Sequence, residues 1–199
     1  MSKMFSKKQG AELVKLARKS IEYRLATGNR LSEICQDNSY MEERGIFVTI
    51  STYPKKALRG CIGFPYPVKP LWGAVIEAAE EAALHDPRFS PTKAEELDNT
   101  TIEVSILTKP EEVRLPKKEI PKSLKIGEDG LIIQRGYSSG LLLPQVAAEQ
   151  GWKAETFLEA CSEKAGLLAS MWKSEETTVK KFQAQVFKET KPRGPVEED

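Results

Sequence analysis

The chain has 199 residues, of which 30 are Lys or Arg and 29 are Asp or Glu, so its formal net charge is +1. Hydrophobic residues make up 40% and charged residues 30%, a composition typical of a folded globular protein rather than a disordered or fibrous one. The balanced charge makes nucleic-acid binding the least favoured class of function, because such binding uses a basic surface.

The cysteines and the N-terminus bear on the compartment in which the protein works. Cys35, Cys61 and Cys161 are widely spaced and contain no CxxC pair, so they indicate neither a zinc site nor a disulfide framework. No apolar run approaches the roughly 18 residues that span a bilayer, and the N-terminus lacks the apolar region of a secretory signal. We therefore predict a cytoplasmic protein with no metal site and no membrane span.

The first half of the chain combines helical and alternating patterns. Ser6 with Gln9 three residues later is typical of a helix start, and Gly28 is suited to ending that helix. Alternating β-branched residues predict strands on both sides of Pro54. In chain order we expect a helix over 6–27, strands over 45–53 and 57–64, a helix over 71–84, a helical turn over 92–95 and a strand over 101–108.

The second half has shorter elements joined by tight turns. We expect strands over 124–126 and 131–135 as a hairpin, a strand over 141–143, helices over 144–151 and 156–165, and a last strand over 179–187. Residues 191–199 are rich in charge, Pro and Gly, so we expect a flexible charged tail after a domain over 5–190. Short turns between strands favour antiparallel pairing and an α+β fold.

The segment Leu58–Gly63, with the sequence LRGCIG, is the most unusual in the chain. Gly60 and Gly63 within a strand indicate a bulge or a close approach to the backbone. Arg59 is suited to binding a carboxylate or phosphate bidentately, and a neighbouring cation lowers a thiol pKa, which makes Cys61 a candidate nucleophile. The alternative is that Cys61 is a small buried hydrophobe. Strand alternation places Cys61 on the face opposite Ile62 and Phe64.

Further candidates lie at the ends of the predicted elements. Asp86 and Arg88 follow the alanine-rich helix, either as a local turn or as part of a site. Glu103 lies on the strand face opposite its apolar neighbours, either as a solvated residue or as a partner for a cation such as Arg59 or Arg88. We expect Arg59, Asp86, Arg88 and Glu103 to come together. Gln145 opens a predicted helix whose N–H groups could bind an anion, and the alternative is an ordinary helix start with no ligand. His85, the single histidine, is either a helix cap or a partner for the Cys61 thiol.

Known cofactor motifs are absent from the sequence. Nothing in it resembles a Walker loop, a dinucleotide-binding GxGxxG, a zinc-binding HExxH helix or a GxSxG nucleophile elbow, so we expect no cofactor. The stretch Gly60–Gly63 matches the GxxG clamp of RNA-binding KH domains, but its middle residues are apolar and no helix–loop–helix surrounds it.

Six segments together resemble the AMMECR-type domain family. They are LRGCIG at 58–63, DPRF at 86–89, IEVS at 102–105, IGxDGL beginning at Ile126, GLLLPQV at 140–146 and KAGL at 164–167. The resemblance runs from the first helix to Phe187, in one order and at compatible spacing, and the short tail is similar to archaeal or bacterial single-domain members. The family often has Thr after the second glycine of the motif, where this chain has Phe64.

The resemblance implies two unequal subdomains, each an antiparallel sheet with helices, separated by a cleft, with both chain ends in the larger one. It also implies a modification pathway shared with a Memo-like protein and a radical S-adenosylmethionine protein, because prokaryotic members are encoded beside them. The family supplies no established reaction.

Three classes of function are therefore compatible with the sequence. The first is a binding or accessory subunit that presents Gly60, Ile62, Gly63, Asp86, Arg88 and Gln145. The second is an enzyme that uses Cys61, Arg59 and Glu103 in the cleft. The third, nucleic-acid binding, is the least favoured at a net charge of +1.

Overall fold

The computed structural model describes residues 5–198. The chain forms two compact units: unit 1 comprises Met1–Leu107 and Gln185–Asp199, and unit 2 comprises Thr108–Ala184. Both units combine helices with antiparallel strands, so the predicted α+β class is confirmed.

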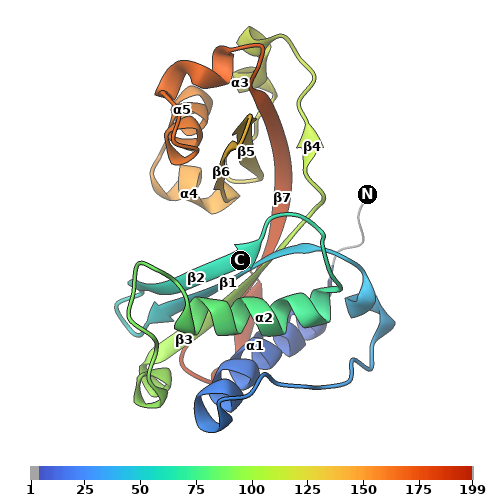
Figure 1. Ribbon diagram of the computed structural model, residues 1–199, viewed down its shortest axis with the longest axis vertical. Coiled ribbons are helices and arrows are strands. Elements are labelled where there is room, and N and C mark those ends of the chain that lie inside the picture. The colour runs from blue at the N-terminus through green and yellow to red at the C-terminus, as the bar shows by residue number, and fades with distance from the viewer. Residues whose placement is uncertain (1–4, 199) are drawn as a thin grey trace. The chain divides into compact units, whose positions relative to one another are not determined.

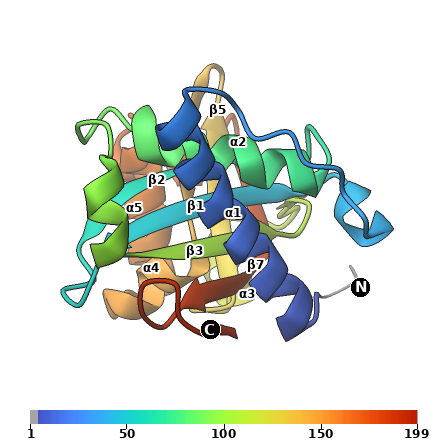
Figure 2. The same cartoon turned by 90° about the horizontal axis from the view of Figure 1, so that it is seen from below.

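Unit 1 is a sheet covered on one face by two helices. Its strands are β1 (Gly45–Thr52), β2 (Leu58–Phe64), β3 (Thr100–Leu107), the final part of β7 (Thr178–Glu189) and β8 (Val196–Glu198), in the order β2-β1-β3-β7 with β8 paired to β7. The helices are α1 (Lys7–Thr27) and α2 (Leu71–Leu84), with 3-10 turns η1 (Asn38–Met41) and η2 (Ala94–Asn99). Figure 2 shows α1 and α2 lying across the sheet of β1, β2 and β3.

Local sequence explains where α1 begins and ends. The Ser6 side chain accepts from the Gln9 N–H at 3.3 Å and the Gln9 side chain accepts from the Ser6 N–H at 3.0 Å, which forms the predicted capping box. Gly28 ends α1 with a φ of 74°.

Among residues 5–198, no helix is long and apolar enough to cross a membrane.

The core of unit 1 follows the alternation of its strands. Ile46, Val48 and Ile50 of β1 point to one face and are fully buried against the apolar sides of α1 and α2. Phe47, Thr49 and Ser51 point to the opposite face and are only partly buried. The sheet therefore has one apolar face under the helices and one more polar face.

Unit 2 is built around an antiparallel sheet. Its elements are β4 (Glu111–Glu112), η3 (Lys117–Glu119), α3 (Ile120–Ser123), β5 (Asp129–Arg135), β6 (Ser138–Leu142), α4 (Pro144–Glu149), α5 (Ala154–Lys164), η4 (Ala169–Lys173) and the first part of β7 (Figure 1). β5 lies between β6 and β7. Leu131 and Ile133 of β5 pack with Phe157, Leu158 and Trp172 in a separate apolar core.

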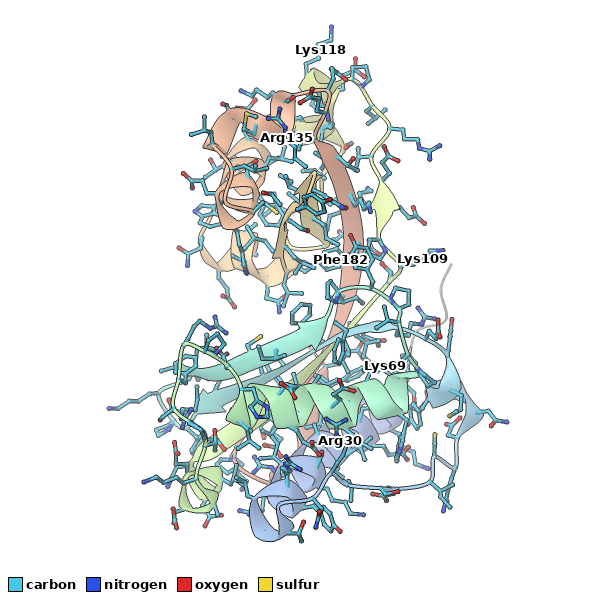
Figure 3. All side chains as sticks on the ribbon, in the orientation of Figure 1. Arg30, Lys69, Lys109, Lys118, Arg135 and Phe182 are labelled. Carbon is cyan, nitrogen blue, oxygen red and sulfur yellow. The ribbon has the colours of Figure 1, made fainter. Side chains whose placement is uncertain are left out.

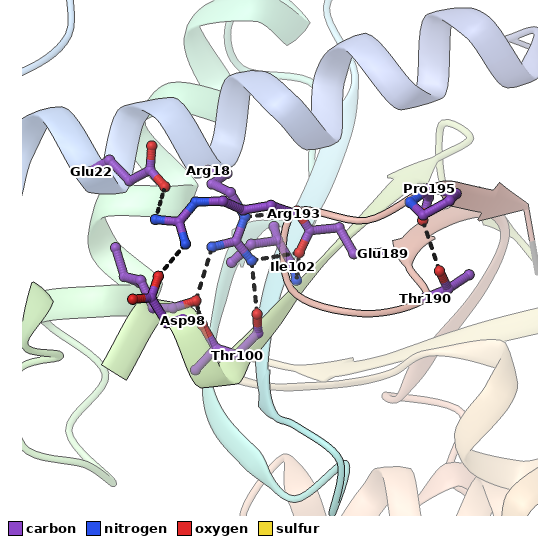
Figure 4. A network of polar contacts seen from close by, with 10 residues as sticks. Arg18, Glu22, Asp98, Thr100, Ile102, Glu189, Thr190, Arg193 and Pro195 are labelled. Carbon is purple, nitrogen blue, oxygen red and sulfur yellow. Dashed lines mark hydrogen bonds and ion pairs between the residues drawn. The ribbon is translucent and has the colours of Figure 1, made fainter. Parts of the chain in front are cut away.

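We predicted a flexible tail after residue 190, but residues 196–198 form a strand, β8. Val196–Glu198 pair with Phe187–Glu189 of β7, and Val196 is buried in the core of unit 1. Arg193, in the turn before β8, forms ion pairs with Asp98 and with Glu22 (Figure 4). The burial of Val196 and the ion pairs of Arg193 hold this segment against unit 1. Its composition alone predicts disorder.

The predicted strand over 124–126 is also wrong. The Asp129 side chain accepts from the Lys125 N–H at 3.0 Å, and Gly127 has a φ of 86°, so residues 125–129 form a turn closed by a side chain. β5 instead pairs with β6.

Candidate functional site

Cys61 lies in a row of side chains on the partly exposed face of the unit 1 sheet. It is directly opposite Thr49 of β1, and Thr49 is directly opposite Glu103 of β3. Residues opposite one another in antiparallel strands share a face. Ile62 and Phe64 pack against the apolar core on the other face, as the alternation predicted. We call Thr49, Cys61 and Glu103 the sheet-face row.

The segment after α2 covers the backbone of Cys61. β2 is at the edge of the sheet, and the Cys61 N–H donates to Asp86 Oδ2 at 2.8 Å. The Cys61 carbonyl accepts from Arg88 Nη2 at 3.2 Å. The Asp86–Arg88 pair thus satisfies the groups that a further strand would use, which prevents another chain from pairing at this point.

Asp86 and Arg88 also hold each other. Arg88 Nε donates to Asp86 Oδ1 at 2.9 Å and Arg88 Nη2 donates to Oδ2 at 2.7 Å, while the Asp86 side chain is 2% exposed. The Arg88 guanidinium, followed by the backbone N–H groups of Cys61 and Arg88, holds the pKa of the Asp86 carboxyl far below its usual range. Asp86 is therefore an ionised, fully engaged structural carboxylate at neutral pH.

We expect Asp86→Asn to lower the free energy of unfolding by about 2–3 kcal/mol at pH 7. The folded-state pKa of Asp86 is depressed, so its stabilisation is present above the unfolded-state pKa of about 4 and is lost as the pH falls through the folded value. In urea unfolding, the difference between wild type and variant should therefore be largest near pH 6 and shrink towards pH 2. A difference that does not change with pH would show that the charge of Asp86 does not stabilise the fold.

Arg59 is engaged within the chain as well. Its Nε and Nη2 donate to the two carboxylate oxygens of Glu96 at 2.8 and 3.1 Å, and its guanidinium lies 5.9 Å from the centre of the Phe89 ring. The hydrogen bonds from Arg59 lower the pKa of Glu96. Arg88 lies over the same ring at 5.6 Å. We predicted that the Arg59 guanidinium would bind a carboxylate or phosphate ligand bidentately. It instead binds the Glu96 carboxylate of the same chain.

The two glycines of the LRGCIG segment allow close packing. A Cβ atom on Gly60 would lie 2.1 Å from the Ala82 carbonyl oxygen of α2, and one on Gly63 would lie 2.0 Å from the Ile46 carbonyl oxygen of β1. Both obstacles are backbone atoms, which cannot rotate away as a side chain can. Backbone packing therefore explains why these two positions lack a side chain, without reference to any ligand.

The Cys61 thiol is partly buried and is uncharged at neutral pH. Burial raises its pKa above the ordinary value, Glu103 and Asp86 add to that effect, and the Thr49 hydroxyl and Arg88 oppose it. The Thr49 hydroxyl donates to the Cys61 sulfur at 3.3 Å. The cation that acts on the thiol is Arg88 rather than Arg59, which is occupied by Glu96.

Three of the predicted site residues, Asp86, Arg88 and Glu103, act on Cys61 in unit 1, and Arg59 lies over the same Phe89 ring as Arg88. Gln145 lies at the start of α4 in unit 2, where it is half-buried. His85 ends α2, with its Nδ1 atom 3.1 Å from a Glu81 oxygen, in the capping position that we weighed against a role beside the thiol. In the described part of the chain, no three His, Cys, Asp or Glu side chains are grouped to hold a metal ion.

Sequence reasoning missed Thr49, Phe89 and Glu96. Thr49 could have been predicted from the hairpin around Pro54, because the pairing of β1 with β2 places Thr49 opposite Cys61. Phe89 belongs to the DPRF segment, but only the structure shows that the guanidinium groups of Arg59 and Arg88 both lie over its ring. Glu96 carries no sequence signal, since 37 positions separate it from Arg59.

Comparisons with known proteins agree with this fold. The AMMECR1 family model matches residues 14–187. Protein PH0010 of Pyrococcus horikoshii is 50% identical over 192 residues, covering 94% of this chain and 93% of that protein. Protein MK0488 of Methanopyrus kandleri is 44% identical over 200 residues, covering 100% and 97%.

A solved structure matches the fold along nearly its whole length. The crystal structure of the uncharacterized protein PH0010 superposes with a TM-score of 0.92 at 48% identity, covering 96% of each chain. The family model and these relatives together confirm the resemblance predicted from the six sequence segments, and the chain belongs to the AMMECR1 family.

Proposed function

We propose that this protein is a binding or accessory subunit, and that the LRGCIG segment is a rigid platform for a partner rather than a set of catalytic groups. One observation carries the proposal: each of the two arginines near Cys61 is already paired with a carboxylate of the chain. Arg59 holds Glu96 and Arg88 holds Asp86, each bidentately.

A thiol enzyme would need a different arrangement. The nucleophile in such enzymes is the thiolate, which a nearby unpaired cation or imidazole stabilises. Here burial raises the pKa of Cys61, and the cation that touches its backbone is already paired with Asp86. These contacts support the binding role over the alternative in which Cys61, Arg59 and Glu103 act on a substrate.

The sheet-face row is the part of unit 1 that suits a partner. Its residues lie on three adjacent strands, and the Asp86–Arg88 pair and the close packing at Gly60 fix the position of β2. A rigid surface loses little conformational entropy on binding, which favours affinity. Gln145 and the cleft implied by the resemblance remain part of this proposal as predictions.

The partners that the family resemblance suggests are a Memo-like protein and a radical S-adenosylmethionine protein, in a shared modification pathway. The experiment is a calorimetric titration of the purified chain with each of these proteins from the same organism. We expect binding to at least one of them, with Cys61→Ser equal to wild type and Thr49→Lys weaker by about tenfold or more. Glu95→Lys, an exposed change on η2, is the matched control and should bind as wild type.

Two outcomes would contradict the proposal. One is that neither protein binds the wild-type chain. The other is that Cys61→Ser, with an unchanged melting temperature, abolishes a turnover that the mixture otherwise shows, since this would make the thiol catalytic.

A further inference from the structure

A second site lies beside α1, in a pocket of about 370 Å³. One wall is the face of α1 that carries Glu12, Leu16 and Lys19, and the opposite wall is the connection over residues 33–37. Figures 1 and 2 show this connection returning alongside α1 from the end of that helix to η1. Pockets for small ligands have volumes of about 300–1,000 Å³, so this one is large enough for a small organic molecule.

Aromatic rings form the floor of the pocket. The rings of Tyr40 and Trp72 lie 5.6 Å apart at an interplanar angle of 30°, and both side chains line the cavity. Ile34, also a lining residue, is 88% exposed, which is unusual for a large apolar side chain. A ligand with an apolar body would cover Ile34 and contact the Trp72 ring.

The walls are held in place by polar contacts. The Trp72 indole N–H donates to the Glu33 carbonyl at 3.0 Å, and Lys19 forms an ion pair with the Glu33 carboxylate at 2.7 Å. Further along the connection, Arg30, labelled in Figure 3, pairs with the buried Glu80 of α2 at 3.1 Å. The connection is thus attached to both helices, and the pocket exists before any ligand binds.

The pocket lining carries both carboxylates and ammonium groups. The lining contains Glu12, Glu33 and Asp37 against Lys15 and Lys19. Lys19 is neutralised by Glu33, whereas within residues 5–198 the Glu12 carboxylate is paired with no cation and accepts a hydrogen bond from the Tyr40 hydroxyl at 2.6 Å. Burial first, and the hydrogen bond to Glu12 second, raise the pKa of Tyr40, so this hydroxyl stays protonated and donates to Glu12.

We propose that this pocket binds a small organic cation, an amine with an apolar body, whose ammonium group pairs with Glu12 and whose body packs on Trp72 and Ile34. Carboxylates and aromatic ring faces both attract an ammonium group, the latter through the negative potential of the ring. An anion of the same shape would face the Glu12 carboxylate. The proposal is independent of the role given to the sheet-face row.

Two probes that differ only in charge test it: phenethylamine and 3-phenylpropionate. The readout is the indole N–H resonance of Trp72 in a ¹H–¹⁵N NMR spectrum, assigned by its disappearance in Trp72→Phe. We expect phenethylamine to shift this resonance saturably, and 3-phenylpropionate to bind at least tenfold more weakly. Glu12→Gln keeps an acceptor for Tyr40 but removes the charge, so it should weaken phenethylamine binding by threefold or more.

The control is Glu95→Gln, which removes one negative charge at an exposed position of η2, outside the pocket lining. It should leave the affinity for phenethylamine unchanged. Equal affinity for the two probes, no shift with either of them, or an unaltered affinity in Glu12→Gln would each overturn the proposal.

Discussion

Gly60→Ala is expected to lower the free energy of unfolding by roughly 2–4 kcal/mol. The added Cβ atom would lie 2.1 Å from the carbonyl oxygen of Ala82, so α2 or β2 must move. Moving either element disturbs the fully buried contacts between Ala79 or Ala82 and the strands beneath them. Urea unfolding followed by circular dichroism measures the loss.

Gly73→Ala is the matched control for this variant. Gly73 lies in α2, the helix that Gly60 approaches; it is exposed and has no atom within 4 Å of its added Cβ. Alanine favours a helix over glycine by up to about 1 kcal/mol, so this change should stabilise the protein. If both variants shifted stability in the same direction and by similar amounts, the close approach of α2 to Gly60 would not be the cause.

Arg18→Met should cost about 3–5 kcal/mol, the usual result of removing one partner of a buried ion pair. The Arg18 and Glu189 side chains are 7% and 4% exposed, and Arg18 Nε donates to Glu189 Oε1 at 2.7 Å. Arg18 also donates to the carbonyls of Leu97 and Thr100 at 3.2 and 2.8 Å (Figure 4). The variant leaves a buried carboxylate and two carbonyls with fewer donors.

Two further variants separate this effect from a general loss of charge. Arg193→Ala removes the two ion pairs to Glu22 and Asp98, which lie at the surface, so it should cost less than about 1 kcal/mol. Adding Glu189→Leu to Arg18→Met removes the stranded carboxylate and should recover part of the loss, as measured by thermal unfolding. A double variant that is no more stable than Arg18→Met would contradict this explanation.

The sequence predicts those parts of the fold whose signals are local. The Ser6–Gln9 capping box and Gly28 mark both ends of α1, and strand alternation correctly separates Cys61 from Ile62 and Phe64. In the candidate site, Arg59, Asp86 and Arg88 are recognisable because their charges adjoin apolar elements. The structure adds which carboxylate each arginine holds.

What the sequence could not predict depends on contacts between distant segments. Val196 joins the core only because β7 extends as far as Glu189 and offers an edge for β8. Lys125 and Asp129 form a turn through a side-chain hydrogen bond, which the composition of the segment does not distinguish from a strand. Glu96 meets Arg59 through η2, whose position follows from the packing of the whole unit.

The central claim is that Cys61 is a partly buried, protonated thiol in a platform whose two arginines are already paired with carboxylates. The measurement that tests it most directly is the rate of iodoacetamide labelling of Cys61 in the native protein, followed by mass spectrometry from pH 6 to pH 10. We predict slow labelling at pH 7, an inflection above the ordinary thiol pKa of about 8.5, and no slowing in Arg59→Ala, because Arg59 is held by Glu96. Fast labelling at pH 7 with an inflection below that pH, slowed by Arg59→Ala, would contradict the claim and identify Cys61 as an activated nucleophile.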